Sequence, residues 1–205
     1  MMRIAQKHTT RHFMACIVAL MTMMLLAACS ETGKGNSTGA FTPTATLLRQ
    51  GVAMKTFTGP DFTIRYPADW KSTAAYGPAI FVDPTRTYDL LISSKPNPDG
   101  LIPPEQVIKN GLATWRNTPV PVSTMSVTET LGGQIWSQRA VIGNDYLLKD
   151  GKLVLVELVT LVTNYPKQSA DTKTYSIIYE APASLFSQIS NLYFTPMLRS
   201  FAFTT

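Results

Sequence analysis

The sequence has almost no histidine or cysteine, and the positions of the few that exist exclude several classes of function. Both histidines, His8 and His12, and one of the two cysteines, Cys16, fall within the first 28 of the 205 residues. After those 28 residues the chain has no histidine and one cysteine, Cys29. If the first 28 residues are removed, the sequence excludes Ser/His/Asp and Cys/His catalysis, histidine general bases, zinc sites built on His or Cys, haem and iron–sulfur clusters.

An excess of positive charge is also missing once the first 28 residues are set aside. The whole chain carries 18 basic and 13 acidic side chains, which gives a net charge of +5. Without Arg3, Lys7 and Arg11 the 18 basic side chains fall to 15 against 13 acidic ones, so the net charge falls to +2. Nucleic-acid binding normally requires a basic surface. We therefore expect no nucleic-acid partner.

Residues 1–28 have the organisation of a signal peptide. A basic segment, Met1–His12, precedes the apolar run Phe13–Leu26, which is shorter than the ~20 residues that span a bilayer. The following Leu26-Ala27-Ala28-Cys29 resembles the bacterial lipobox. The resemblance implies cleavage after Ala28 and attachment of lipid to Cys29, where several acyl chains, such as palmitate, make a stable anchor. The alternatives are an ordinary signal peptide and an uncleaved anchor.

Beyond Cys29 the composition indicates a tether followed by one domain. Residues 29–46 are rich in Ser, Thr, Gly and Asn and read as a flexible linker. A coil of this length reaches about 20 to 25 Å. Residues 47–205 have a globular composition and the usual length of a single domain. The chain is thus predicted to be a domain tethered to the extracytoplasmic face of a bacterial membrane.

The pattern within residues 47–205 predicts an α+β fold. Three short alternating segments predict strands at 62–66, 79–82 and 89–94, and a helix is expected from Pro103-Pro104 to before Pro119. Gly132-Gly133 predicts a hairpin turn between strands 122–131 and 134–142. A further turn is expected at 143–145 or 150–151. The prediction ends with a strand at 173–179, a helix that begins at Pro182 and a short helix that begins at Thr195-Pro196.

Residues 153–162 form an expected strand that is apolar on both faces, with Glu157 as its only charge. Such a strand is expected in the centre of a sheet that is covered on both sides. A buried carboxylate must be paired, hydrogen-bonded or protonated, and it can serve as a functional acid. We expect Glu157 to pair with Arg139 or Lys173 on a neighbouring strand, with Arg139 preferred, or to face water at a gap in the cover. Glu157 and Arg139 are therefore the candidate buried polar site.

Two other groups of side chains were considered as sites. Carboxylates and amides in expected turns could converge on calcium, but their sequence context favours turn chemistry, and no metal site is expected. They are Asp83, Asp89, Asn97, Asp99, Asn144, Asp145 and Asp150. Aromatic residues near the first strands could line a ligand pocket, although packing in the core is the simpler interpretation. They are Tyr66, Trp70, Tyr76 and Tyr88.

Three stretches together resemble the PsbP-like superfamily, which includes the extrinsic photosystem II subunit and bacterial lipoproteins. They are Phe62-Thr63-Ile64-Arg65-Tyr66-Pro67-Ala68-Asp69-Trp70-Lys71, the hairpin-rich middle, and the closing Met197-Leu198-Arg199-Ser200-Phe201-Ala202-Phe203. The resemblance implies an antiparallel sheet sandwiched by helices. It also implies a protein that acts by binding or assembly. Metal-binding histidines of the photosynthetic members have no counterpart after Cys29.

The function that we expect from the sequence is that of a membrane-anchored, extracytoplasmic lipoprotein acting as a non-catalytic binding or assembly module. We expect no catalytic residue and no cofactor, and the sequence does not identify the protein partner. A small apolar-ligand carrier, with a pocket between sheet and helix, is the alternative. A hydrolase that uses two carboxylates is a more remote one, and would require two such groups ~5–9 Å apart.

Overall fold

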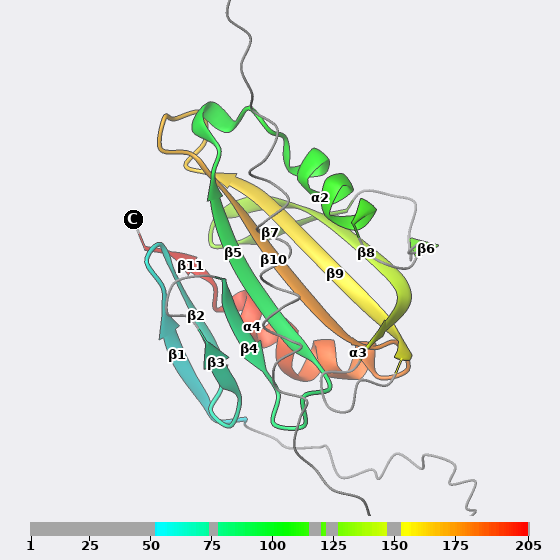
Figure 1. Ribbon diagram of the computed structural model, residues 1–205. Helices are drawn as coiled ribbons and strands as arrows, with labels where there is room; N and C mark the ends of the chain where they lie inside the picture. The colour runs from blue at the N-terminus through cyan, green and yellow to red at the C-terminus, as the bar shows by residue number, and fades with distance from the viewer. Residues whose placement is uncertain (1–51, 74–77, 115–119, 122–126, 147–152, 205) are drawn as a thin grey trace, which may run out of the picture. The chain divides into compact units, whose positions relative to one another are not determined.

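The computed structural model describes residues 52–73, 78–114, 120–121, 127–146 and 153–204 (Figure 1). They form an α+β domain, as the sequence predicts. The strands are antiparallel and are joined to a few short helical segments. The strands in chain order are β1 (Met54–Thr58), β2 (Phe62–Pro67), β3 (Lys71–Thr73), β4 (Ala79–Val82), β5 (Asp89–Pro96), β6 (Val120–Pro121), β7 (Val127–Leu131), β8 (Gln134–Tyr146), β9 (Leu153–Tyr165), β10 (Lys173–Pro182) and β11 (Ala202–Phe203).

The strands form two sheets. The main sheet has the order β3-β4-β5-β10-β9-β8-β6, and β7 pairs with β8 on the same side as β6. The small sheet has the order β1-β2-β11. β9, β8 and β10 are the longest strands and lie side by side, so the apolar β9 is an interior strand, as expected (Figure 1).

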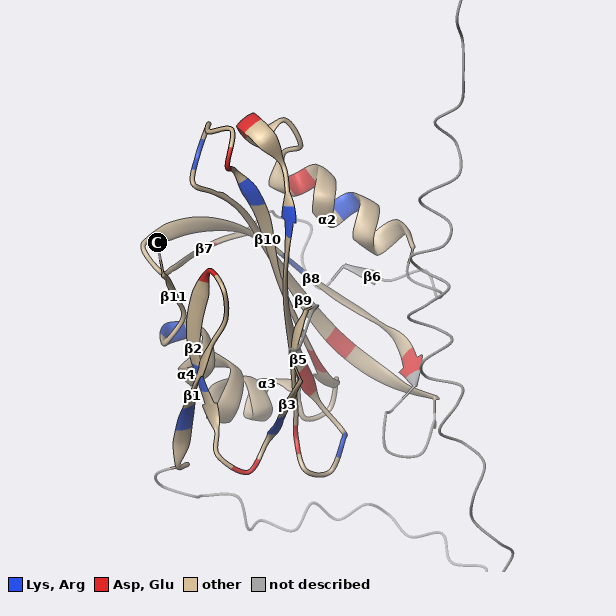
Figure 2. Cartoon of the chain, turned by 60° about the vertical axis from the view of Figure 1, so that its left-hand side comes forward, with Lys and Arg blue, Asp and Glu red and all other residues tan. Residues whose placement is uncertain are grey.

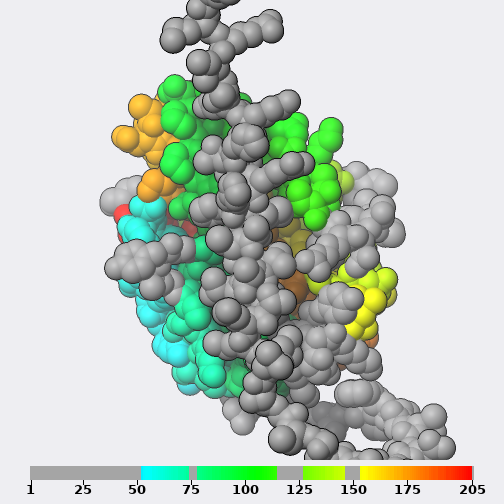
Figure 3. All heavy atoms as spheres, viewed as in Figure 1, coloured from blue at the N-terminus to red at the C-terminus, as the bar shows by residue number. Residues whose placement is uncertain are grey.

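Helices cover both faces of the main sheet. On one side lie α3 (Phe186–Ile189), the π-helical turn η2 (Ser190–Phe194) and α4 (Thr195–Arg199), which share a buried cluster with the small sheet. We call this side the inner face. On the outer face lies α2 (Pro104–Ala113), which packs on β8 and β9 and buries Ile108. In the space-filling view α2 and the β1–β2 hairpin stand on opposite sides of the molecule (Figure 3). The predicted helix–sheet–helix sandwich is confirmed.

Alternation along the strands assigns each side chain to one face. Buried aromatic and aliphatic residues fill the inner face, including Phe81 and Leu90 on β4 and β5, Ile177 and Leu161 on β10 and β9, and Trp136 on β8. The alternate side chains of the same strands point to the outer face, and they include both apolar and polar groups. The hydrophobic core therefore lies mainly between the inner face, the small sheet and α3–α4.

Local turn chemistry accounts for the hairpin that was predicted correctly. Gly132 and Gly133 have φ of 56° and 75°, and Leu131 lies opposite Gln134 across a two-residue turn. A Cβ on Gly132 would also lie 3.2 Å from the Phe201 ring, so the turn packs closely on the C-terminal segment. Glycine is needed here for both reasons.

Three expected boundaries are wrong. β8 continues through Gly143–Asp145 to Tyr146, because its partner β9 is long enough to keep the ladder going; the alternative turn at 150–151 lies outside the described residues. Pro182 ends β10, opposite Val156, and α3 begins only at Phe186. Thr195 is helical (φ −59°, ψ −48°) and caps nothing, because η2 carries the helix directly into α4. The weak strands β1 and β3 were missed.

Candidate functional site

The residues of the expected lipid anchor lie outside the part of the chain that the structure describes. Ala28, Cys29 and the linker 29–46 belong to the residues before Val52, and Tyr76 and Asp150 lie in two later gaps. The expectations for these residues remain predictions. The candidate sites below all lie among the described residues from Val52 onward.

The expected pairing of Glu157 with Arg139 is wrong. Across the β8–β9 ladder Glu157 lies opposite Ile142, whereas Arg139 lies opposite Thr160. Arg139 shares the face of Thr160, and positions 157 and 160 of one strand differ by an odd number. The side chains of Glu157 and Arg139 are therefore on opposite faces of the sheet. Lys173 is not the partner either, since its Nζ lies 2.7 Å from Asp61 Oδ2.

Glu157 is half-buried on the inner face, between Ile142 on β8 and Ala181 on β10. Burial raises the pKa of its carboxyl above the ordinary value. Among the described residues no hydrogen bond or ion pair holds this carboxylate. Partial exposure to water therefore offsets the desolvation of the carboxylate. Of the three expected outcomes, this is the one in which Glu157 faces water.

Of the carboxylates and amides that were considered for calcium, Asp83 and Asn97 hold turns, whereas Asp89 lies in β5 and Asn144 and Asp145 lie in β8, so the turn interpretation is wrong for these three. Asp83 is buried, and its carboxylate accepts hydrogen bonds from the backbone N–H groups of Thr85, Thr87 and Tyr88. Asn97 is buried as well; its amide donates to Ile102 O at 2.9 Å and to Thr174 Oγ1 at 3.0 Å. No group of three or more metal-ligating side chains converges within the described ranges. The turn interpretation is confirmed for Asp83 and Asn97.

The aromatic residues near the first strands belong to the core. Tyr66 and Trp70 are buried, and Trp70 packs against Tyr88 and Tyr193 with ring centroids 5.5 Å apart in each case. Tyr88 is half-buried and stacks on Tyr193, and burial raises the pKa of its hydroxyl. These residues tie β2 and the turn before β5 to η2, so the packing interpretation is confirmed for them.

A cavity of about 200 Å³ lies between the inner face and α4, and we call it the α4 cavity. Its lining is mixed: the buried leucines Leu131, Leu161 and Leu198 stand beside the polar side chains of Gln138 and Thr195. Tyr179 is the buried polar residue of the lining. The pKa of its hydroxyl is raised first by burial and then by the negative charges of Glu129 and Glu157. Glu129 and Arg199, both exposed, supply charges of opposite sign at the opening.

A second polar feature lies on the outer face, where two acids are direct neighbours. Asp89 on β5 lies opposite Glu180 on β10, so both side chains point to the same side of the sheet. Burial raises the pKa of Asp89 to about 7 and that of Glu180 to about 8, and nearby carboxylates, including Asp145, add to both shifts. The described part of the chain contains no ion pair to either one. Near neutral pH the pair therefore holds at least part of a proton.

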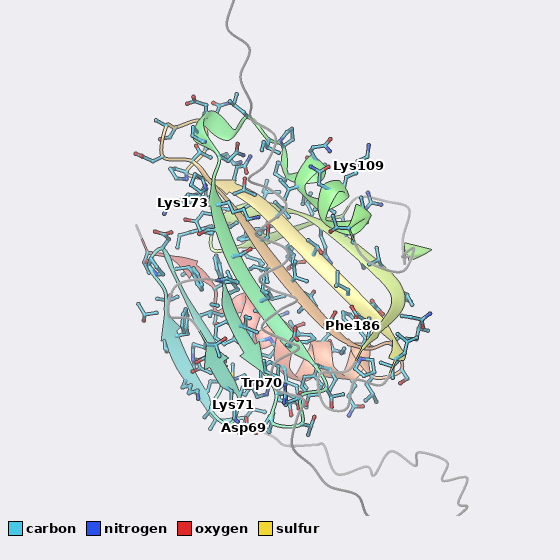
Figure 4. The ribbon with its side chains drawn as sticks, in the orientation of Figure 1. Asp69, Trp70, Lys71, Lys109, Lys173 and Phe186 are labelled. Carbon is cyan, nitrogen blue, oxygen red and sulfur yellow. The ribbon has the colours of Figure 1, made fainter. Side chains whose placement is uncertain are left out.

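The third feature is a wide cleft of about 540 Å³, which lies where the β9–β10 turn meets the start of β2. It contains the Lys173–Asp61 ion pair and the hydroxyl of Tyr175, whose pKa is raised to about 12, mainly by burial and by Asp61. Figure 4 shows Lys173 at one end of the domain and Asp69, Trp70 and Lys71 at the other. Charged residues of both signs are spread over the domain (Figure 2), as the small net charge suggested.

The sequence did not point to the α4 cavity or to the acid pair. Both depend on which strands pair and in which register, and β5 and β10 are far apart in the chain. The only available signals were weak: Glu129 and Leu131 alternate before the double glycine, and Glu180 interrupts an apolar strand. Neither signal says which residue lies opposite.

The class defined by these observations is an α+β domain with two antiparallel sheets, helices on both faces of the larger one, and small sites on each face. No model of a known protein family matches the chain, and no curated protein matches it by sequence. Among solved structures it is similar to LpqN of Mycobacterium tuberculosis, a protein described as involved in cell envelope biogenesis. The two are 17% identical with a TM-score of 0.44, over 75% of this chain and 91% of that one. A likeness of this size carries no conclusion about activity or partners.

Among the described residues no helix has both the length and the apolar character needed to cross a membrane.

Proposed function

We propose that this chain is a lipoprotein anchored to the extracytoplasmic face of a bacterial membrane, and that its PsbP-like domain is a non-catalytic binding or assembly module. The observation that carries the proposal is the order of segments along the chain. A basic segment and a short apolar run lead to Leu26-Ala27-Ala28-Cys29, then to a polar linker, and then to the domain. Lipid on Cys29 would hold the domain within a linker length of the headgroups.

The arrangement of polar groups in the domain supports a binding role more than a catalytic one. Buried carboxylates and amides such as Asp83 and Asn97 are occupied in holding turns. Catalysis by two carboxylates would need an acid and a base in one cleft. Asp89 and Glu180 are adjacent, but they lie in a ladder rather than in either cavity described above.

Metabolic labelling with a fatty acid tests the anchor. The wild-type chain should incorporate the label and have a mature N-terminus at Cys29, as read by mass spectrometry. Cys29→Ala should lose the label and accumulate as precursor or as a secreted form, whereas Cys16→Ala, within the same leader, should behave as wild type. A mature N-terminus at any other residue, or labelling that survives Cys29→Ala, contradicts the proposal.

The second candidate is a carrier of small apolar ligands, and the α4 cavity is the observation that favours it. The cavity lies between sheet and helix, as the carrier hypothesis requires, and three leucines contribute to its lining. At about 200 Å³ it is smaller than the ~300–1,000 Å³ of pockets that enclose a drug-sized ligand. A carrier would therefore have to enlarge it, and fluorescence titration with a fatty-acid probe would detect saturable binding if it does.

A further inference from the structure

We propose that β7 and the α4 cavity together form a docking site for an extended peptide segment of a partner protein, which adds as a strand to the free edge of β7. The inference deepens the binding role proposed above and rests on it. β7 pairs with β8 alone, so its other edge has no strand beside it among the described residues. Val127, Thr128, Glu129 and Thr130 are all exposed.

The hairpin register identifies the backbone groups on this edge. Leu131 and Gln134 flank the two-residue turn and therefore form a hydrogen-bonded pair, and bonded and non-bonded pairs alternate along an antiparallel ladder. Thr130–Ile135 is thus a non-bonded pair, which agrees with the hydrogen bond from Thr163 Oγ1 to Ile135 O, 2.9 Å long, on the β9 side. The N–H and C=O groups of Thr128 and Thr130 consequently point away from β8.

The edge lacks most of the features that usually block strand addition; the one it has is a single inward-pointing charge, Glu129. Edge strands are commonly protected by being short or by lysine, proline or a bulge. At the opposite edge of the main sheet, β3 is three residues long and carries Lys71. β7 is five residues long, is in continuous register with β8, and has no lysine or proline. Its single charge, Glu129, points to the inner face.

The α4 cavity lies where a side chain of the added strand would fall. Glu129 and Leu131 alternate with the outward-pointing threonines and line the cavity, so an added strand would place every second side chain beside them. In strand addition the backbone supplies affinity and pockets for alternate side chains supply specificity. The three leucines of the lining and the volume of about 200 Å³ fit one bulky, largely apolar side chain, and Gln138 and Tyr179 offer it polar contacts.

The charges at the opening narrow the chemistry of the segment. Arg199 and Glu129 are exposed, and neither forms an ion pair within the described ranges. A segment with a bulky apolar residue, an acidic residue for Arg199 and a basic residue for Glu129 is complementary to the opening. These features match a peptide better than a lipid or a nucleic acid, because a row of backbone groups pairs with another backbone.

For the test, the full chain is immobilised in detergent micelles. A phage-displayed library of random dodecapeptides is then selected for binding to it. Enriched peptides should carry an apolar residue with charged neighbours of both signs. Thr128→Pro, which removes an outward N–H at an edge position that tolerates proline, should weaken their binding about tenfold or more. Arg199→Glu, a surface change that leaves the fold intact, should weaken peptides that carry the acidic residue.

Matched variants make the result specific. Thr56 in the edge strand β1 also points its N–H outward, because Gly59 N donates to Phe62 O and Ala68 N donates to Ala53 O. Thr56→Pro and Arg65→Glu should therefore leave peptide binding unchanged. Three results would each overturn the proposal. The first is that the library yields no enriched peptide, and the second is that the enriched peptides bind all four variants equally. The third is that the chain binds no peptide but forms a dimer that Thr128→Pro abolishes. Peptide binding does not depend on labelling of Cys29, so failure of this site and failure of the anchor are distinguishable.

Discussion

The two faces of the main sheet are built from the same strands, yet they carry different kinds of residues. The inner face forms one continuous cluster of large aromatic and aliphatic side chains with the small sheet and α3–α4. On the outer face α2 packs on β8 and β9, and this face carries buried threonines and the adjacent acids Asp89 and Glu180. Alternation along each strand assigns successive residues to one or the other of these two environments.

The difference shows where stability and where pH dependence reside. Packed aromatic rings contribute through buried area and contacts that do not titrate, so the inner face should respond strongly to truncation and weakly to pH. Two adjacent acids contribute through protonation, so the outer face should respond in the opposite way. Each prediction below tests this division, beginning with the largest effect.

Adjacent residues of β8 provide the sharpest comparison of truncations. Trp136 is fully buried on the inner face, its Nε1 donates to Leu131 O at 3.1 Å, and its ring stacks on Phe203. Trp136→Ala should lower the free energy of unfolding by about 3–5 kcal/mol. Ile135→Ala, at the next position on the outer face and 60% exposed, should cost less than about 1 kcal/mol. Urea unfolding of both variants measures the difference; similar losses would contradict the division.

The acid pair should make the domain more stable in mild acid than in mild base. Folding raises the pKa of Asp89 to about 7 and of Glu180 to about 8, so between about pH 4 and 8 the folded state binds more protons than the unfolded state. Stability then falls as the pH rises through that window. Because both side chains are half-buried, we expect about 1–3 kcal/mol between pH 5 and pH 8.

The variants Asp89→Asn and Glu180→Gln identify the source of this pH dependence. Either one removes a titrating group and should flatten the curve and raise stability at pH 8. Asp171→Asn, at an exposed position in the β9–β10 turn, should leave the curve as in wild type. Unfolding midpoints in urea from pH 5 to pH 8 provide the measurement, and a wild-type curve that rises with pH would show that the pair does not control stability.

Patterns within a few consecutive residues predicted the fold well. They could not predict the register between strands that are far apart in the chain. The double glycine located the β7–β8 hairpin, and the two-sided apolar pattern placed β9 inside the sheet, because both signals lie within a few consecutive residues. The pairing of Glu157 with Arg139 failed because alternation shows which residues of one strand share a face and leaves open which residue of the next strand is opposite. The Asp89–Glu180 pair was missed for the same reason.

The smallest effect is expected at Glu157, the one charge on the apolar inner face of β9. An Arg139 counter-charge would have made Glu157→Gln strongly destabilising, but Arg139 is on the other face, opposite Thr160. Burial raises the pKa of Glu157, so folding disfavours its charged form. Glu157→Gln should therefore raise the free energy of unfolding at pH 7 slightly, by less than about 1 kcal/mol, since the residue is only half-buried. Urea melts at pH 5 and pH 7 distinguish this from a purely steric effect, because the gain should shrink at pH 5, where the wild-type carboxyl is closer to neutral. A loss of several kcal/mol would mean that the carboxylate has a partner that the described residues do not supply.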